Sequence, residues 1–254
     1  MSACSAISFF WKIHYSLVCP TESNYVFLFI KGISRKFKNI LTKAYPISYE
    51  ELSKIFSYAS GDSDLESLPF VDLRFIVFLL TSYSSFGRYE EVSNLKLADV
   101  CKEDEGFVLT FLKRKNYQFG ESNIGVVSNL PRLKFNPAKL FSLYLDKVAL
   151  IHSKSNSPSD YLFPSLRKSR SVLHSLDKPV SYSVLLKQFK FCVKECNIEV
   201  GLHSLRRGGV THAVRAGAPH SVVQKCMRVK AETMVGYYAT LTSKELSSAS
   251  NLAF

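Results

Sequence analysis

The stretch GLHSLRRGGVTHAV, residues 201–214, brings together side chains that can bind phosphate. His203 and Arg206 are three positions apart at the start of an expected helix, so both side chains lie on one face. A guanidinium and an imidazole beside the N–H groups of a helix N-terminus form a suitable phosphate site. Most isolated pairs with this spacing are only a basic helix start with a surface histidine, so this stretch alone does not establish a site.

The same stretch contains two glycines, Gly208 and Gly209, where the pattern is otherwise helical. Each glycine in a helix interior costs about 1 kcal/mol relative to alanine. A backbone without side chains lets a neighbouring backbone approach closely. We therefore expect the two glycines to make room for a bulky ligand such as a nucleic-acid strand.

A second stretch, GRYEEVSNLKLADV at residues 87–100, places Arg88 and Glu91 directly after the nearly all-apolar segment 68–83. An arginine near the edge of a core requires a carboxylate or a phosphate partner, because burying an unpaired charge is costly. The two alternatives for Arg88 are a plain ion pair with Glu91 and a contact with a bound phosphate.

Helices are expected to position most of these residues. Ser48 and Glu51 have the spacing of a capping box, which predicts that a helix and the main domain begin there. Segment 68–83 is predicted to be a buried central helix. Gly217 is expected to end the helix that carries the second basic stretch. The other helices are predicted over residues 137–151, 182–196, 204–216 and 231–238, with a short one from His220.

Two apolar segments, 107–112 and 124–130, are predicted to be strands of one hairpin. The basic segment KRKNYQFGES, residues 113–122, would join them. The predicted fold class is therefore α+β and mostly α-helical, with a small antiparallel β-sheet or hairpin inserted among the helices.

The composition is that of a globular protein of 254 residues with an excess of positive charge. Lys and Arg total 33 against 21 Asp and Glu, a formal net charge of +12 that favours an anionic partner such as nucleic acid. Residues 31–48 contain five basic residues and no acidic one. This segment suits either a linker that lies along a polyanion or a solvated basic surface.

The cysteines and the apolar runs limit the class of protein further. The six cysteines form no CxxC pair and have no histidine at metal-ligand spacing, so a reduced intracellular compartment and no metal are expected. Cys192 and Cys196 are interpreted as small core residues rather than zinc ligands. The run FIVFLL at residues 75–80 is far below the roughly 20 residues of a membrane span, so we expect a soluble protein without a secretory signal.

Taken together, these stretches resemble the tyrosine site-specific recombinases, or phage-type integrases. The first box of that family is similar to R-x-x-E with Leu at +7 and Asp at +11, and the chain matches it with Arg88, Glu91, Leu95 and Asp99. The second box is similar to H-x-L-R-R followed by G-G-x-T, which HSLRRGGVT reproduces over residues 203–211.

Two further segments resemble the same family. KNYQFG, residues 115–120, is similar to the K-T-D-Q-x-G turn of one branch. VGYYATLTSKEL, residues 235–246, places a tyrosine where the nucleophile of the family stands. The resemblance implies a catalytic domain over residues 48–254, a basic linker over residues 39–47, and a remnant of the helical core-binding domain, which clamps DNA, over residues 1–38.

The resemblance also implies a reaction and a set of partners. A tyrosine hydroxyl attacks a DNA phosphodiester, forms a 3′-phosphotyrosyl link and releases a 5′-hydroxyl that later attacks back. The partner would be double-stranded DNA, on which family members act as homo-tetramers, with no cofactor, metal or membrane. The protein would be intracellular and associated with DNA, in the nucleus of a eukaryote or the cytoplasm or nucleoid of a prokaryote.

The resemblance assigns a role to each site residue. Arg88 and Arg206 would hold the non-bridging phosphate oxygens, and Lys115 would protonate the leaving 5′-oxygen. His203 would donate a hydrogen bond or shuttle the proton of the nucleophile, which is Tyr237 or, as the alternative, Tyr238. DNA contacts are expected from the basic residues around these boxes, namely Lys36, Lys38, Lys113, Arg114 and Arg207.

One position departs from the pattern of the family. The family has His or Trp where this chain has Val229, so one contact at the phosphate is missing, and Arg228 is a possible substitute. With the shortened N-terminal segment, this leaves a second hypothesis, a catalytically degenerate, mobile-element-derived DNA-binding protein of the same fold. A third hypothesis, an RNA-processing or ribosome-associated basic protein, rests on charge alone and explains neither box.

Overall fold

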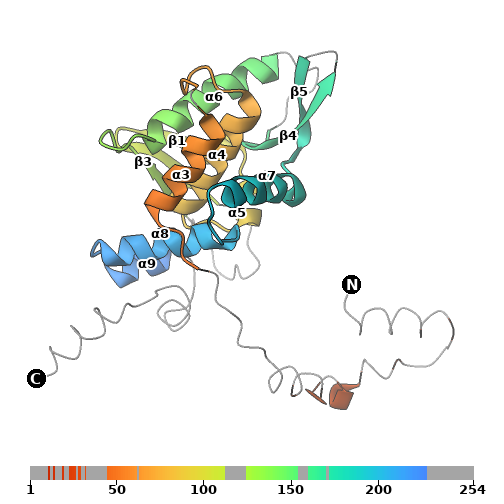
Figure 1. Cartoon of the computed structure of the whole chain (residues 1–254). Helices are drawn as coiled ribbons and strands as arrows, with labels where there is room; N and C mark the ends of the chain where they lie inside the picture. The colour runs from red at the N-terminus through yellow and green to blue at the C-terminus, as the bar shows by residue number, and fades with distance from the viewer. Residues whose placement is uncertain are drawn as a thin grey trace, which may run out of the picture. The chain divides into compact units, whose positions relative to one another are not determined.

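The computed structural model describes residues 45–61, 63–111, 124–153, 160–169 and 172–227, with a few positions between Trp11 and Gly32 (Figure 1). The chain forms two compact units, Met1–Lys43 and Ala44–Phe254, and the elements described below belong to the second. Part of the predicted site falls outside the described residues, namely Lys36, Lys38, Lys113, Arg114, Lys115, Arg228, Val229, Tyr237 and Tyr238.

Helices dominate this unit, as the sequence predicts. They are α3 (Tyr49–Ser60), α4 (Phe70–Ser84), α5 (Tyr89–Ser93), α6 (Pro137–Ser153), α7 (Tyr182–Glu195), α8 (His203–Arg215) and α9 (His220–Met227), with a 3-10 turn at Leu97–Asp99. The predicted helix over residues 231–238 lies outside the described residues. Among the helices that the structure describes, none has the length and apolar character needed to cross a membrane.

Helix α3 begins at the predicted capping box. The Ser48 hydroxyl accepts a hydrogen bond from the Glu51 N–H at 3.1 Å, and the Glu51 carboxylate accepts one from the Ser48 N–H at 2.8 Å. Leu52, Ile55 and Phe56 of this helix are buried. The cap and the apolar face therefore agree, and the predicted helix start is confirmed.

Helix α4 is the central helix of the core. All residues from Leu73 to Ser82 are buried, which fits a helix that is apolar on every side. Arg74 is the charged residue in this buried stretch, and its Nη1 donates to the Pro164 carbonyl at 2.6 Å. Helix α4 packs against α3, α5, α6 and α8, so it lies at the centre of the helical packing.

In the described part of the chain, two small antiparallel sheets accompany the helices. The first has the order β1 (Val100–Glu103), β2 (Gly106–Thr110) and β3 (Ile124–Ser128), and the second pairs β4 (Pro164–Ser169) with β5 (Val172–Pro179). The two predicted strands are β2 and β3, and the predicted fold class is confirmed. The prediction of a single hairpin was wrong, because β1, β4 and β5 are also present. The missed strands carry many polar residues, and strand formation there depends on pairing and packing rather than on local propensity.

Helix α8 is buried over residues Ser204–Thr211, whereas His203 and Arg215 at its ends are exposed. A Cβ on Gly208 would collide with the Ile47 carbonyl, and a Cβ on Gly209 would collide with the Tyr83 carbonyl. The prediction that these glycines make room for nucleic acid was therefore wrong. The backbones that approach them are those of the chain itself: Gly208 lies against Ile47, in the segment before α3, and Gly209 lies against Tyr83, near the end of α4.

Candidate functional site

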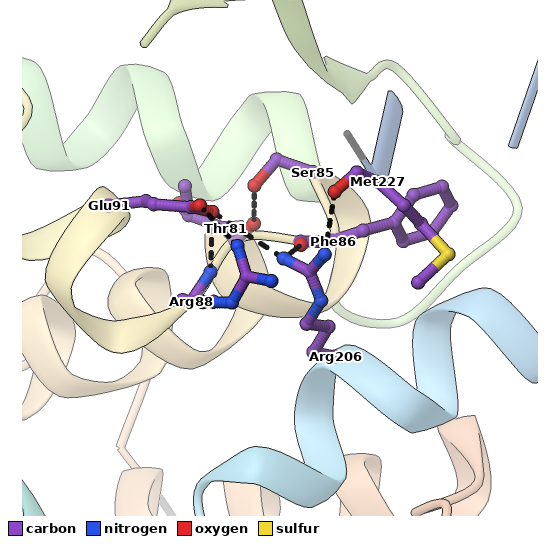
Figure 2. A network of polar contacts seen from close by, with 7 residues as sticks. All are labelled: Thr81, Ser85, Phe86, Arg88, Glu91, Arg206 and Met227. Atoms are coloured by element: carbon purple, nitrogen blue, oxygen red, sulfur yellow. Dashed lines mark hydrogen bonds and ion pairs between the residues drawn. The ribbon is translucent and has the colours of Figure 1, made fainter. Parts of the chain in front are cut away.

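The structure brings Arg88 and Arg206 to one carboxylate, that of Glu91 (Figure 2). Arg88 Nη1 donates to Glu91 Oε1 at 2.8 Å, and Arg206 Nη1 lies 3.5 Å from Glu91 Oε2. The two arginines belong to boxes that are far apart in the sequence. The tertiary fold therefore builds one cationic centre from both boxes.

Arg88 stands directly before α5 and is the more accessible of the two. Its backbone N–H donates to Glu91 Oε2 at 2.9 Å, so the carboxylate that pairs with its side chain also caps the helix. The Arg88 side chain is 44% exposed. The ion pair with Glu91 is thus present, and the exposed part of the guanidinium can reach a ligand at the surface.

Arg206 is held inside the protein with only 1% of its side chain exposed. Nη1 donates to the Phe86 carbonyl at 2.6 Å, and Nη2 donates to the Met227 carbonyl at 2.6 Å (Figure 2). These bonds connect α8 to the turn after α4 and to the last residue of α9. Charge-assisted hydrogen bonds of this kind fix the orientation of the guanidinium plane.

The turn between α4 and α5 contributes further to this arrangement. The Ser85 hydroxyl is buried and donates to the Thr81 carbonyl at 2.6 Å, which holds the end of α4 (Figure 2). Gly87 lies against Val92, since a Cβ on Gly87 would collide with the Val92 side chain. Arg88 therefore directly follows a tightly packed turn.

His203 is the first residue of α8 and lies at the surface end of this helix. Desolvation lowers the pKa of the His203 imidazole, and the positive charges of Arg206, Arg88 and Arg207 lower it further. The ring is therefore neutral at neutral pH and can accept a hydrogen bond or a proton. The same charges indicate that His203 stands in the electrostatic field of the arginine pair.

Arg207 was expected to contact DNA, but the structure places it inside the unit with 3% exposure. Cys192 is buried at 3% exposure and Cys196 is partly buried, which agrees with their interpretation as core residues. Across the described ranges, no group of three or more His, Cys, Asp and Glu side chains could hold a metal ion.

The structure therefore assembles Arg88, His203 and Arg206 of the predicted site. Sequence reasoning identified Glu91 as a partner of Arg88 but missed its contact with Arg206. It also missed the carbonyl groups of Phe86 and Met227. Backbone acceptors have no signal in residue type, so no pattern in the sequence could have found them.

Comparisons with known proteins support the resemblance of the boxes. The model of the phage integrase family matches residues 47–245. The structure is similar to XerH site-specific recombinase bound to its palindromic difH substrate in a post-cleavage complex, with 16% identity and a TM-score of 0.61. That match covers 84% of this chain and 54% of XerH, so the chain spans about half the length of that protein.

Two other solved structures have a similar fold. XerA recombinase is 17% identical with a TM-score of 0.58, covering 99% of this chain and 74% of XerA. The Tn1549 transposon integrase in complex with a circular intermediate DNA is 13% identical with a TM-score of 0.57, covering 97% of this chain and 75% of that one. No curated protein matches the sequence. At these identities the similar structures show a shared fold.

Proposed function

The chain belongs to the phage integrase family, and from this premise we propose that it is a site-specific DNA recombinase or integrase that cleaves and rejoins DNA through a 3′-phosphotyrosyl intermediate. The observation that carries the proposal is the convergence of Arg88 and Arg206 on the Glu91 carboxylate, at 2.8 and 3.5 Å. Two guanidinium groups held this close form a cationic centre that suits the non-bridging oxygens of a phosphodiester.

In the proposed reaction, the hydroxyl oxygen of Tyr237 attacks the phosphorus atom and the bond to the 5′-oxygen breaks. Lys115 gives its proton to the leaving 5′-oxygen, which becomes a 5′-hydroxyl. Negative charge builds up on the non-bridging oxygens in the pentavalent transition state, and Arg88 and Arg206 stabilise it there. A 5′-hydroxyl of a new partner strand reverses these steps and frees the tyrosine.

His203 would take part as a neutral imidazole. Because its pKa is lowered by desolvation and by the neighbouring arginines, it can accept the tyrosine proton or a hydrogen bond at neutral pH. Tyr238 is the alternative nucleophile. Arg228 would take the place of the His or Trp that the family has where this chain has Val229.

The proposed partner is double-stranded DNA, bound by a homo-tetramer. The XerH and Tn1549 integrase structures contain DNA, which supports this partner, and the transposon origin of the latter supports a mobile element. The proposed domains are a core-binding remnant over residues 1–38, a basic linker over residues 39–47 and the catalytic domain over residues 48–254. The surface DNA contacts would come from Lys36, Lys38, Lys113 and Arg114.

The test is the formation of a covalent protein–DNA complex on labelled, nicked duplex DNA taken from the flanks of the gene itself. Wild type would be compared with Tyr237→Phe and Tyr238→Phe on a denaturing gel. A slow band that is lost only in Tyr237→Phe is the expected result. DNA binding on a native gel without any covalent band would contradict the proposal and favour the degenerate DNA-binding protein.

A further inference from the structure

Phe86, in the turn between α4 and α5, has a backbone φ of +53°. This is the left-handed region, which glycine adopts easily and other residues rarely do. The N–H of Gly87 donates to the Ser82 carbonyl at 3.2 Å, so the end of α4 has the bonding of a Schellman motif. Glycine is the usual left-handed residue of this motif and asparagine the second choice.

The chain uses those usual residues at two other helix ends. Gly217 follows α8 with φ +87°, and Asn197 follows α7 with φ +55°. The N–H of Ala218 donates to the Ala213 carbonyl at 3.0 Å, and the N–H of Ile198 donates to the Val193 carbonyl at 2.8 Å. Phe86 is therefore the exception among three similar turns, and its large side chain requires a specific reason.

The contacts of Phe86 supply that reason. Its carbonyl accepts the 2.6 Å hydrogen bond from Arg206 Nη1 (Figure 2). Its ring packs against a small core cluster of Val210, Val223 and Met227, which belong to α8 and α9. The carbonyl of Met227 accepts the other 2.6 Å bond of Arg206. The ring and the carbonyl of Phe86 are thus attached to the same two helices that hold the Arg206 guanidinium.

We propose that Phe86 is a positioning residue for the arginine pair; its effect on DNA cleavage rests on the proposed function. The ring anchors the turn on α8 and α9, and the left-handed backbone directs the carbonyl toward Arg206. The same turn delivers Arg88, two residues later, to Glu91. One residue with an unfavourable backbone conformation therefore sets the position of both guanidinium groups.

The test compares Phe86→Gly with Phe86→Val. Glycine keeps the left-handed conformation accessible, whereas a β-branched valine strongly disfavours it. At saturating DNA, the rate constant of covalent complex formation should fall about 10- to 100-fold in Phe86→Val, and KM should change little. Phe86→Gly keeps the backbone conformation but loses the anchoring ring, so its rate should fall less than that of Phe86→Val. A merely structural role predicts the reverse order, because glycine loses the whole ring.

A second pair covers the case in which Phe86→Val does not fold. Phe86→Ala and Phe86→Gly both lack the ring and differ by one methyl group, so they isolate the backbone conformation. Alanine should be slower than glycine by roughly 5- to 30-fold, the factor that follows from the left-handed penalty of a non-glycine residue. Equal losses in the two variants would show that the backbone conformation has no role.

A spectroscopic measurement tests the positioning without any cleavage. In ¹⁵N-labelled protein, the Nε–H resonance of Arg206 should lose its shift and slow exchange in Phe86→Val, and should change less in Phe86→Gly. Arg74, which is buried and donates to the Pro164 carbonyl, is the reference that should not change. An unchanged Arg206 resonance in a folded Phe86→Val would overturn the proposal. A wild type that never cleaves DNA would refute the proposed function and leave this measurement valid.

The matched control is Asn197→Val beside Asn197→Gly. These substitutions make the same backbone change at the left-handed position after α7, where Asn197 is exposed. Thermal unfolding should shift, while the cleavage rate and the Arg206 resonance should not. If the Asn197 variants reduce cleavage as much as the Phe86 variants, the effect is general destabilisation and the proposal is wrong.

Discussion

Glu91 and Arg206 face each other at 3.5 Å although 115 residues separate them in the chain. Their side chains are 7% and 1% exposed, and the same carboxylate also holds Arg88 at 2.8 Å. A single buried carboxylate therefore compensates part of the charge of two arginines. The centre stays net positive, which preserves its attraction for phosphate while limiting the cost of burying Arg206.

Replacing Glu91 by glutamine should destabilise the protein because Arg206 loses its carboxylate. Removing one partner of a buried ion pair costs about 3–5 kcal/mol. We expect about 2–3 kcal/mol here, because glutamine keeps a hydrogen-bonding oxygen and the Arg88 side chain is 44% exposed. Urea unfolding of Glu91→Gln measures the loss. Glu90→Gln, at the exposed neighbouring position, is the control and should change stability by less than about 0.5 kcal/mol.

Arg206→Lys should reduce the rate of covalent complex formation by about 100- to 1000-fold, the usual effect of removing one donor from a transition-state site. A lysine ammonium has no planar fork, so it cannot reproduce the two bonds by which Arg206 holds the Phe86 and Met227 carbonyls. Single-turnover kinetics on the nicked substrate measures this. Arg215→Lys, at an exposed position of the same helix, should react as wild type does. A wild-type rate in Arg206→Lys would exclude the assigned role.

The lowered pKa of His203 predicts a dependence of stability on pH. Its usual pKa is 6.5, and desolvation followed by the charges of Arg206, Arg88 and Arg207 lowers it in the folded state. As the pH falls below that value, the unfolded chain takes up the proton first. The stabilisation is therefore complete above about pH 6.5 and is lost as the pH falls through the folded pKa.

The measurement for His203 is Tm as a function of pH. Between about pH 7 and pH 5, Tm should fall less in His203→Gln than in wild type, because the variant lacks this protonation. His220→Gln, which changes an exposed histidine at the start of α9, should follow wild type. The lowered pKa also predicts that the cleavage rate of wild type falls at a lower pH than the usual histidine pKa of 6.5 would give. Identical dependences of Tm on pH in wild type and His203→Gln would contradict the lowered pKa of His203.

Gly209→Ala should destabilise the protein without a specific effect on DNA affinity. The added methyl group collides with the Tyr83 carbonyl, and overpacking of this kind costs about 1–3 kcal/mol, partly offset by the better helix propensity of alanine. Gly201→Ala is the control, since a Cβ there meets no atom within 4 Å. Urea unfolding and salt-matched DNA titrations measure the two effects. A stable Gly209→Ala with weakened DNA binding would restore the interpretation that this glycine makes room for DNA.

Much of the fold was predictable because helix signals are local. The capping box of Ser48 and Glu51, the apolar segment that forms α4, and Gly217 after α8 all act within a few residues of the chain. The strands β4 and β5 were missed because their stability depends on pairing with each other and packing on the unit. Local patterns identify helices better than they identify strands of mixed polarity.

The candidate site divides in the same way. The sequence by itself indicated the family, since four boxes stand in the order and spacing that the family has, among them those of Arg88 and of His203 and Arg206. Only the tertiary structure decided that Arg206 is buried against Glu91 and that Gly208 packs against the backbone of the chain itself. The physical reason is that burial and close backbone approach arise where segments distant in the sequence meet, and no local pattern contains the geometry of that contact.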